Sequence, residues 1–325
     1  MPERATVLQV SQIGVETTPG VGGTANKLLP SVLWEIGPDG QTNEYGGSGA
    51  KYDSQAILSK EWSTGKFSGP LDYEGWIYLA SGIYAKVSPS GAGTAKTWTM
   101  TPANRARDTL ATFAIEQGDD VRAHRALSTY INSLKVGWSR AEAKVEGTSI
   151  GQPIADGITL ATPVTAIAQK PVSPADVEFW LDSTSGGLGT TKLLRVMAAE
   201  FEVGDRIGQS WPGNKAVSGF AAGFELKPKV ALKLSMQADA QGMAFLDHAR
   251  SRGLTKFLRW KFTGDLITGS DYYSIQFDFA VQVLKLPAFK NGDGTYDVDV
   301  ELKVVHDETW GKAFVVTTVN TIATL

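Results

Sequence analysis

Short segments in which apolar and polar residues alternate recur along the chain, and glycine-containing turns separate most of them. The alternation is clearest in residues 109–117, 130–147, 272–283 and 296–305. Because successive side chains of a strand point to opposite faces, each segment predicts a strand with one apolar and one polar face. A further strand is expected at 27–36, ended by the turn residues Gly37-Pro38-Asp39-Gly40.

Two segments depart from the period of two. In 72–84, Trp76, Leu79 and Ile83 recur at helical spacing, and the segment 239–252 is likewise helical in pattern. Asp72 and Asp239 precede these segments, where an aspartate can cap a helix N-terminus. The sequence therefore predicts a mainly β fold with minor α content.

The same order of elements occurs twice. Matching residues lie at a nearly constant separation of 162–167 positions, and they are Lys27-Leu28-Leu29 with Lys192-Leu193-Leu194, Glu35 with Glu200, Gly75 with Gly242, Leu79 with Leu246, Trp98 with Trp260, and Tyr130 with Tyr296. Such a recurrence indicates two copies of one β-β-α-β-β-β unit. The alternative is a coincidence between two generic β domains. The expected organisation is an N-terminal arm (1–26), a first β domain (27–150), a connector (151–191) and a second β domain (192–325).

Composition excludes several classes of protein. The chain has no cysteine, which removes disulfides, zinc–thiolate sites, iron–sulfur clusters and thiol nucleophiles. The net charge is −3 and neither half is basic, so tight nucleic-acid binding is disfavoured. The chain contains no run of about 18 apolar residues, so the sequence predicts no membrane-spanning helix. The first residues lack the apolar region of a secretory signal.

No motif predicts a catalytic, cofactor or metal site. Asn291-Gly292-Asp293-Gly294 lacks the glutamate that completes a calcium loop, so it predicts a hairpin turn. The run 186–192 is glycine-rich, but its lysine is not followed by Ser or Thr as in a phosphate loop. The three histidines have neither zinc-site nor triad spacing. We therefore expect no enzyme activity.

Several segments resemble the major tail tube proteins of long-tailed, siphovirus-type bacteriophages, in their duplicated-domain form. They are Ile13–Gly20 with Ala25–Leu29, Trp62–Glu74, Phe113–Asp119, Ile131–Gly147 and Asp176–Phe201. The resemblance covers nearly the whole chain in element order. It implies two tandem tail-tube-type β-sandwich or barrel domains, each flanked by a helix.

The resemblance also implies a function. Members of this family are structural virion proteins that self-assemble into stacked rings, and the rings form the hollow viral tail tube through which DNA is ejected. The implied partners are other copies of this chain, with a homotrimer (a pseudo-hexamer) favoured over a hexamer because of the duplication. Tape-measure and tail-terminator or tip proteins are further implied partners. DNA would pass without specific binding, and assembly would take place in the host cytoplasm.

Candidate site residues follow from charge and loop composition. A conduit for DNA must repel phosphate, so the acidic and polar side chains of the last long strands are candidates to face the lumen. These are Asp297, Asp299, Glu301, Asp278 and Gln276. The alternative is that they lie on an outer solvated face. The polar loop near residues 44–50 is expected to reach between rings, with Glu44, Tyr45, Ser48 and Lys51 as contact candidates.

Two other functions stay open at this stage. A carbohydrate-binding β-sandwich module would use exposed Trp62, Trp98 or Trp211. A hydrolase with Asp/Glu catalysis would need a deep cleft and a carboxylate with a raised pKa.

Overall fold

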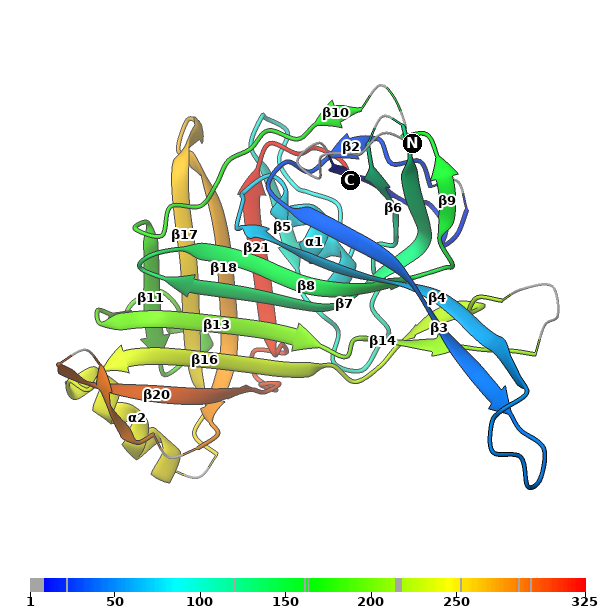
Figure 1. Cartoon of the computed structure of the whole chain (residues 1–325). Coiled ribbons are helices and arrows are strands. Elements are labelled where there is room, and N and C mark those ends of the chain that lie inside the picture. The colour runs from blue at the N-terminus through cyan, green and yellow to red at the C-terminus, as the bar shows by residue number, and fades with distance from the viewer. Residues whose placement is uncertain are drawn as a thin grey trace.

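The computed structural model describes residues 9–325 except 22, 120, 161, 163, 214–217, 252, 286 and 293. Its largest feature, here called the long sheet, is an antiparallel row of eight strands that crosses the molecule (Figure 1). In spatial order these are β3 (Leu33–Tyr45), β4 (Gln55–Pro70), β8 (Ala143–Gly151), β7 (Ala123–Ser139), β13 (Val196–Gly204), β16 (Lys229–Gln237), β20 (Thr295–Val304) and β19 (Phe289–Gly292).

A second sheet, the covering sheet, packs on one face of the long sheet. Its order is β12 (Lys192–Leu193), β11 (Val177–Asp182), β17 (Lys256–Thr268), β18 (Asp271–Val283), β21 (Phe314–Asn320) and β5 (Lys96–Met100). The last residues of β18 also pair with β20, which joins the two sheets.

A third group of strands, the N-terminal sheet, lies beside the β3 end of the long sheet. It contains β9 (Ala155–Ile158), the first part of β7, β6 (Phe113–Gly118), β1 (Val10–Val15), β2 (Lys27–Leu28) and β10 (Thr165–Ala166). A separate ribbon is formed by β14 (Ile207–Ser210) and β15 (Ala222–Glu225). Residues 10–15, expected in an extended arm, thus form a strand in the body of the protein.

Two α-helices occur in the described residues, both within the expected segments. Helix α1 (Trp76–Ile83) lies in the core, and α2 (Ala240–Arg250) packs against β18 and β20 near one end of the long sheet (Figure 1). A single 3₁₀ turn is labelled η2 (Ser185–Gly187). Arg252, the expected last residue of the second helix, lies outside the described residues.

One hydrophobic core lies between the long sheet and the elements that cover it. In β13 the side chains of Ala199, Phe201 and Val203 are buried, as the alternation predicts. Residues from both halves of the chain share this core, because Tyr84 of the first half stacks on Phe201 of the second with ring centroids 6.0 Å apart. The two halves therefore stabilise one another.

One expected turn is missing from the structure, and one turn that was not expected is present. Gly37–Gly40 does not end the first strand, and β3 continues through it to Tyr45. A proline is tolerated there because this strand lies at a sheet margin, where its missing N–H removes no ladder bond. Conversely, the alternating run 130–147 is two strands, since Ser139 and Glu142 close a tight turn between β7 and β8.

The repeat holds in part of the chain. Asp72 Oδ1 accepts the N–H of Gly75 at 2.7 Å, and Asp239 Oδ1 accepts the N–H of Gly242 at 2.9 Å, 167 positions later. One other match fails, because Tyr130 is buried within β7 whereas Tyr296 is 76% exposed. Trp98 of β5 and Trp260 of β17 are both buried, and each lies on the first strand after its helix. The segments that lead into the two helices therefore share this aspartate hydrogen bond.

Candidate functional site

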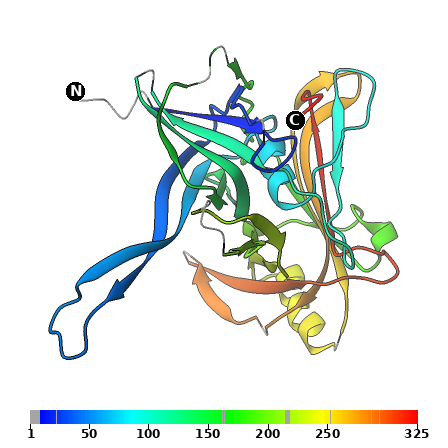
Figure 2. The same ribbon diagram turned by 90° about the vertical axis from the view of Figure 1, so that its right-hand side faces the viewer.

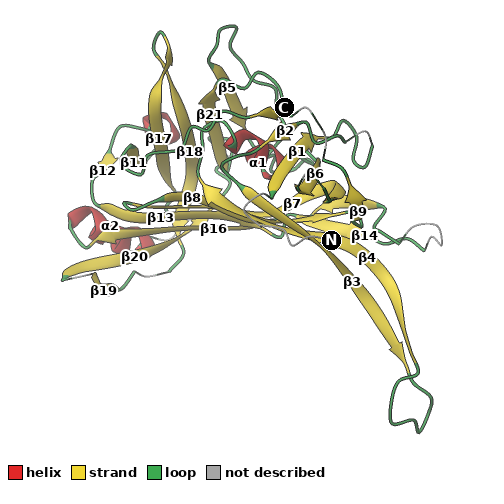
Figure 3. Ribbon diagram, turned by 45° about the horizontal axis from the view of Figure 1, so that its top comes forward, coloured by secondary structure: helices red, strands yellow, loops and turns green. Residues whose placement is uncertain are grey.

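The long sheet buries one face and leaves the other uncovered (Figure 3). Charged side chains occupy the uncovered face, because each alternates with a buried apolar neighbour. They are Glu35, Lys66, Lys135, Lys144, Glu146, Glu200, Glu202, Lys233, Asp299 and Glu301. Two shallow grooves, of 510 and 440 Å³, run between these side chains.

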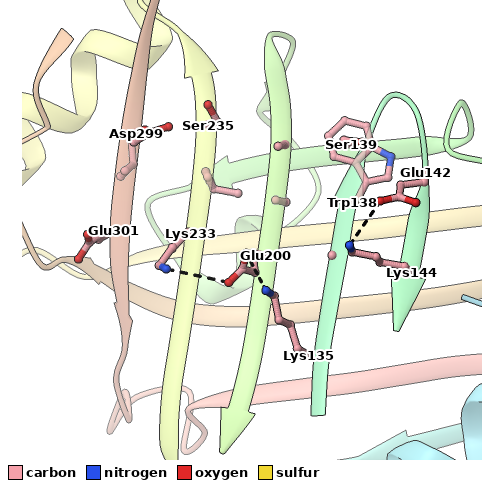
Figure 4. Close-up of a pocket in the computed structure, with 15 residues that line it drawn as sticks. Lys135, Trp138, Ser139, Glu142, Lys144, Glu200, Lys233, Ser235, Asp299 and Glu301 are labelled. Carbon is pink, nitrogen blue, oxygen red and sulfur yellow. Dashed lines mark ion pairs between the residues drawn. The ribbon is translucent and has the colours of Figure 1, made fainter. Parts of the chain in front are cut away.

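Charges on this face are paired across neighbouring strands. The Lys135 Nζ lies 3.2 Å from Glu146. The same Nζ lies 3.3 Å from Glu200, and the Lys233 Nζ lies 4.0 Å from Glu200 (Figure 4). Opposite charges on directly facing strand positions stabilise a sheet modestly. The pairing also leaves the surface close to neutral, with neither a basic track nor an acidic cluster.

Three of the five lumen candidates, Asp297, Asp299 and Glu301, lie on this side of β20. Asp299 accepts a 2.5 Å bond from Lys290, and Glu301 lies 2.7 Å from Lys285. Partial burial acts to raise the pKa of Asp299, but the bonds from Lys290 and Ser235 outweigh it, so this pKa lies below its usual value. Each of the two carboxylates is therefore paired with a neighbouring lysine.

Asp297 is less exposed than these two carboxylates, and the remaining two candidates lie in another sheet. Asp297 is 8% exposed and accepts a bond from Thr295 Oγ1 at the end of β20. Asp278 and Gln276 belong to β18 in the covering sheet, where Asp278 is buried and forms two bonds with Arg259, of 2.6 and 3.0 Å. The structure thus does not bring the five candidates together.

The sequence reasoning missed several charges of the uncovered face, including Lys135, Glu200 and Lys233. The signal is present in the sequence, because the apolar residues Leu134 and Val136 alternate with Lys135, which puts Lys135 on the opposite side of the strand. What alternation cannot supply is the order of strands, and that order alone makes Glu200 a neighbour of both lysines.

The contact candidates Glu44, Tyr45, Ser48 and Lys51 gather at the tip of the β3–β4 hairpin. This hairpin extends well away from the body of the protein (Figure 2). All four residues are exposed, and apolar side chains further down the hairpin, Ile57 and Leu58, are 51% and 54% exposed. These two side chains lie in the part of the hairpin that precedes the pairing of β4 with β8.

An aromatic cluster braces the base of this hairpin. The rings of Trp62 and Trp211 meet edge to face at 5.7 Å, and Trp211 contacts Phe220 at 6.0 Å. Trp98, the third tryptophan of the carbohydrate hypothesis, is 1% exposed and donates its Nε1–H to Asn320. These tryptophans are thus engaged in packing, and Trp98 cannot stack on a sugar.

Asp72 is the carboxylate that a hydrolase hypothesis would single out, since burial raises its pKa despite opposing bonds from backbone N–H groups. Its oxygens accept the N–H groups of Glu74, Gly75 and Lys170 at the start of α1. That environment is a helix cap within the core and has no room for a substrate.

The margin of the long sheet at β3 is closed by side chains from the N-terminal sheet. Ser11 Oγ accepts the N–H of Trp34 at 3.0 Å and donates to its carbonyl, and Gln117 Oε1 accepts the N–H of Ile36 at 2.7 Å. Pro38, next on the same margin, has no N–H. Nothing in the sequence pattern marked Ser11 or Gln117, because each acts on a strand distant along the chain.

The opposite margin ends in the short strand β19. Most of β20 is covered, by β18 near its C-terminus and by β19 near its N-terminus. Strand β19 has only four residues, and its Phe289 is 61% exposed. A short final strand is one way in which proteins limit uncontrolled strand addition.

Comparison with known proteins assigns no family: neither a scan of protein-family models nor a search of curated proteins returns a match. Within the described part of the chain, no helix has the length and apolar character needed to cross a bilayer. The same residues contain no cluster of three or more His, Asp or Glu suited to a metal ion.

Proposed function

We propose that this chain is a structural subunit of the phage tail tube type, which polymerises into stacked rings around a hollow DNA conduit. The observation that carries the proposal is the long sheet. Every other element packs on one of its faces or at its margins, while the other face, with its compensated charges, is left uncovered (Figure 3). A curved wall built from such sheets would have a core outside and a polar lining inside.

The proposal includes two tandem tail-tube-type domains, each with a flanking helix. The proposal is supported by local geometry that recurs at a nearly constant separation along the chain. Glu35 faces Lys66 across β3 and β4, and Glu200 faces Lys233 across β13 and β16. Together with the repeated aspartate caps, this equivalence favours three copies in a ring, which would give six similar units around the axis.

The lining fits a conduit through which DNA slides. DNA binding becomes stronger as more lysines or arginines neutralise phosphates. Each such contact also steepens the dependence on salt, by about 0.9 in the slope of log K against log salt concentration. Lys135 and Lys233 are engaged by carboxylates of the same face, so they offer little net attraction. The lumen residues that we propose are therefore these ion pairs together with Asp299 and Glu301.

The hairpin tip suits contacts between rings. Glu44, Tyr45, Ser48 and Lys51 lie beyond the end of the sheet in the strand direction (Figure 1), so they would reach a copy stacked on that side. The proposed role is architectural, with tape-measure and terminator or tip proteins as further partners in the virion.

Light scattering coupled to size-exclusion chromatography, followed by negative-stain microscopy, tests the proposal. We expect the purified chain to form rings or tubes with a central channel as its concentration rises. A chain that stays monomeric at millimolar concentration, and in the presence of crowding agents, would contradict it. Replacing Ile57 and Leu58 by serine should block stacking while leaving the fold intact, because both side chains are already exposed.

A further inference from the structure

We infer that β3 of one copy pairs antiparallel with β19 of the next copy, with Glu35 opposite Lys290 and Ile36 opposite Phe289. The inference rests on the proposed function, because it requires neighbouring copies in a ring. It adds the two strands that meet, their register, and the side chains that must move before they meet.

The chain contains a template for this joint. Strand β7 of the first half pairs with β13 of the second, with Gly137 opposite Glu200 and Val136 opposite Phe201. Glu35 of β3 lies 165 positions before Glu200, and both face a lysine on the following strand. By this equivalence, the outer margin of β3 should pair with a strand of the second half. That strand is the one whose position corresponds to the position of β7 in the first half.

That strand is β19. In the first half Gly137 faces Lys144, which in turn faces Pro70. In the second half Lys290 faces Asp297, which in turn faces Gln237.

Pro70 and Gln237 are 167 positions apart, the same separation as between the two helix caps. Lys290 therefore occupies the place of Gly137, and it is expected opposite Glu35 of the neighbouring copy. Phe289 follows in register opposite Ile36.

Side-chain chemistry agrees with this register. Glu35 is exposed on the uncovered face, and Lys290 reaches the same face, where it bonds Asp299. Phe289 faces Val298 of β20, which is a core residue, yet Phe289 itself is 61% exposed. The joint would thus place opposite charges together on the lining and cover an exposed aromatic side chain with Ile36 on the other face.

Backbone polarity agrees as well. The N–H groups of Trp34 and Ile36 point away from β4, since side chains outside the pair bind them. Two residues separate β19 from β20, so Gly292 with Thr295 and Lys290 with Asp297 are the hydrogen-bonded pairs of that hairpin. The backbone groups of Phe289 and Asn291 are left facing outward, as antiparallel pairing to Ile36 and Trp34 requires.

In the free subunit, two side chains block the margin of β3 that would pair with β19. Ser11 and Gln117 hold the two N–H groups that β19 would use, so both side chains must release them when copies join. Pro38 lacks an N–H and therefore ends the new ladder after Ile36. This arrangement fixes the register and slows joining until a partner strand is correctly placed.

Cysteine cross-linking tests the register without interference, since the chain has no cysteine of its own. The test variant is E35C/K290C, and both positions are exposed on the uncovered face, so the fold should not change. Oxidation of assembled protein should give disulfide-linked dimers and larger closed species. The matched control is G37C/K290C, displaced by two residues on the same face, where a side chain at Gly37 meets nothing within 4 Å.

Rings or tubes that give no cross-link at 35 and 290, or equal cross-linking at 37 and 290, would overturn the register and leave the proposed function standing. Absence of any assembly of the unmodified chain would overturn both. Cross-linking at 35 and 290 well above the control is the result that we expect.

Hydrogen exchange tests this block of the β3 margin. In Gln117→Ala the Ile36 amide should exchange faster in the free subunit and regain protection in the assembly, where β19 replaces the glutamine. Gln117→Glu keeps an acceptor and should retain protection in both states. An Ile36 amide that stays unprotected in assembled Gln117→Ala would contradict the joint.

Discussion

Helices α1 and α2 begin in the same way and end in different surroundings. Each follows an aspartate whose side chain accepts the N–H of a glycine three residues later, which is Gly75 just before α1 and Gly242 within α2. All eight residues of α1 are buried, whereas Gly242 and Phe245 are the buried residues of α2.

The difference comes from what covers each helix. Trp76 of α1 contacts Phe277 at 5.8 Å, and Tyr84 at its C-terminus contacts Phe314 at 5.7 Å. Both partners belong to the second half of the chain. Helix α2 lies at the end of the molecule near β19, the margin that we assign to a neighbouring copy. The two helices thus differ in burial because the second half of the chain covers α1, whereas α2 lies near one end of the long sheet.

The largest expected effect is on the packing of α1. Trp76→Ala should lower the free energy of unfolding by about 3–5 kcal/mol, since it removes a fully buried ring from the core. The equivalent change in α2, Met243→Ala, should cost about 1 kcal/mol, because Met243 is only half-buried. Urea unfolding of both variants measures the difference. Equal losses of unfolding free energy would show that the two helices contribute alike to stability.

The second effect concerns equivalent polar residues at the helix N-termini. Glu74 is 1% exposed and accepts bonds from Tyr273 and Thr321, whereas Gln241 bonds the backbone of Lys192 and Leu194 at the surface. Glu74→Ala should therefore cost about 1–3 kcal/mol, and Gln241→Ala about 0.5 kcal/mol. Thermal unfolding of the two variants would contradict this order if Gln241→Ala were the more destabilised.

The third effect isolates the cap of α2. Asp239→Ala removes the acceptor for the Gly242 N–H and should cost about 1 kcal/mol, while Asp239→Asn keeps an oxygen there and should cost much less. The measurement is again urea unfolding. A loss as large in the asparagine variant as in the alanine variant would show that the charge, rather than the hydrogen bond, matters.

The smallest effect is a pH dependence confined to α2. Burial, and then the nearby Lys256 ammonium, lower the pKa of His248 below its usual value, with Asp247 opposing. The unfolded chain then binds the proton first as pH falls through about 6.5, so stability falls from there until the folded pKa is reached. Hydrogen exchange of α2 amides at pH 7.5 and 5.5 should show this loosening, and His248→Gln should abolish it.

The sequence alone could predict the elements whose cause is local. Alternation located β6, β18 and β20, and helical spacing with an aspartate cap located both helices. It misplaced Tyr296, expected on an apolar face but 76% exposed, because a strand's apolar face is buried only if something covers it. That covering depends on the order of strands in the sheet.

The candidate site was harder to predict for the same reason. Acidic side chains on two strands, Asp278 and Asp299, are alike in sequence pattern, yet one binds Arg259 in the covering sheet and the other lies on the uncovered face. The blocking residues Ser11 and Gln117 act across 23 and 81 positions of the chain. Long-range pairing of this kind leaves no periodic signature.

Cryo-electron microscopy of the assembled protein tests most directly whether copies of this chain form a tube. We expect a hollow tube of stacked trimeric rings, in which the face bearing Lys135, Glu200 and Lys233 lines the channel and β3 meets β19 between copies. A compact monomer with no assembled form, or a tube whose channel is lined by the covering sheet, would contradict it.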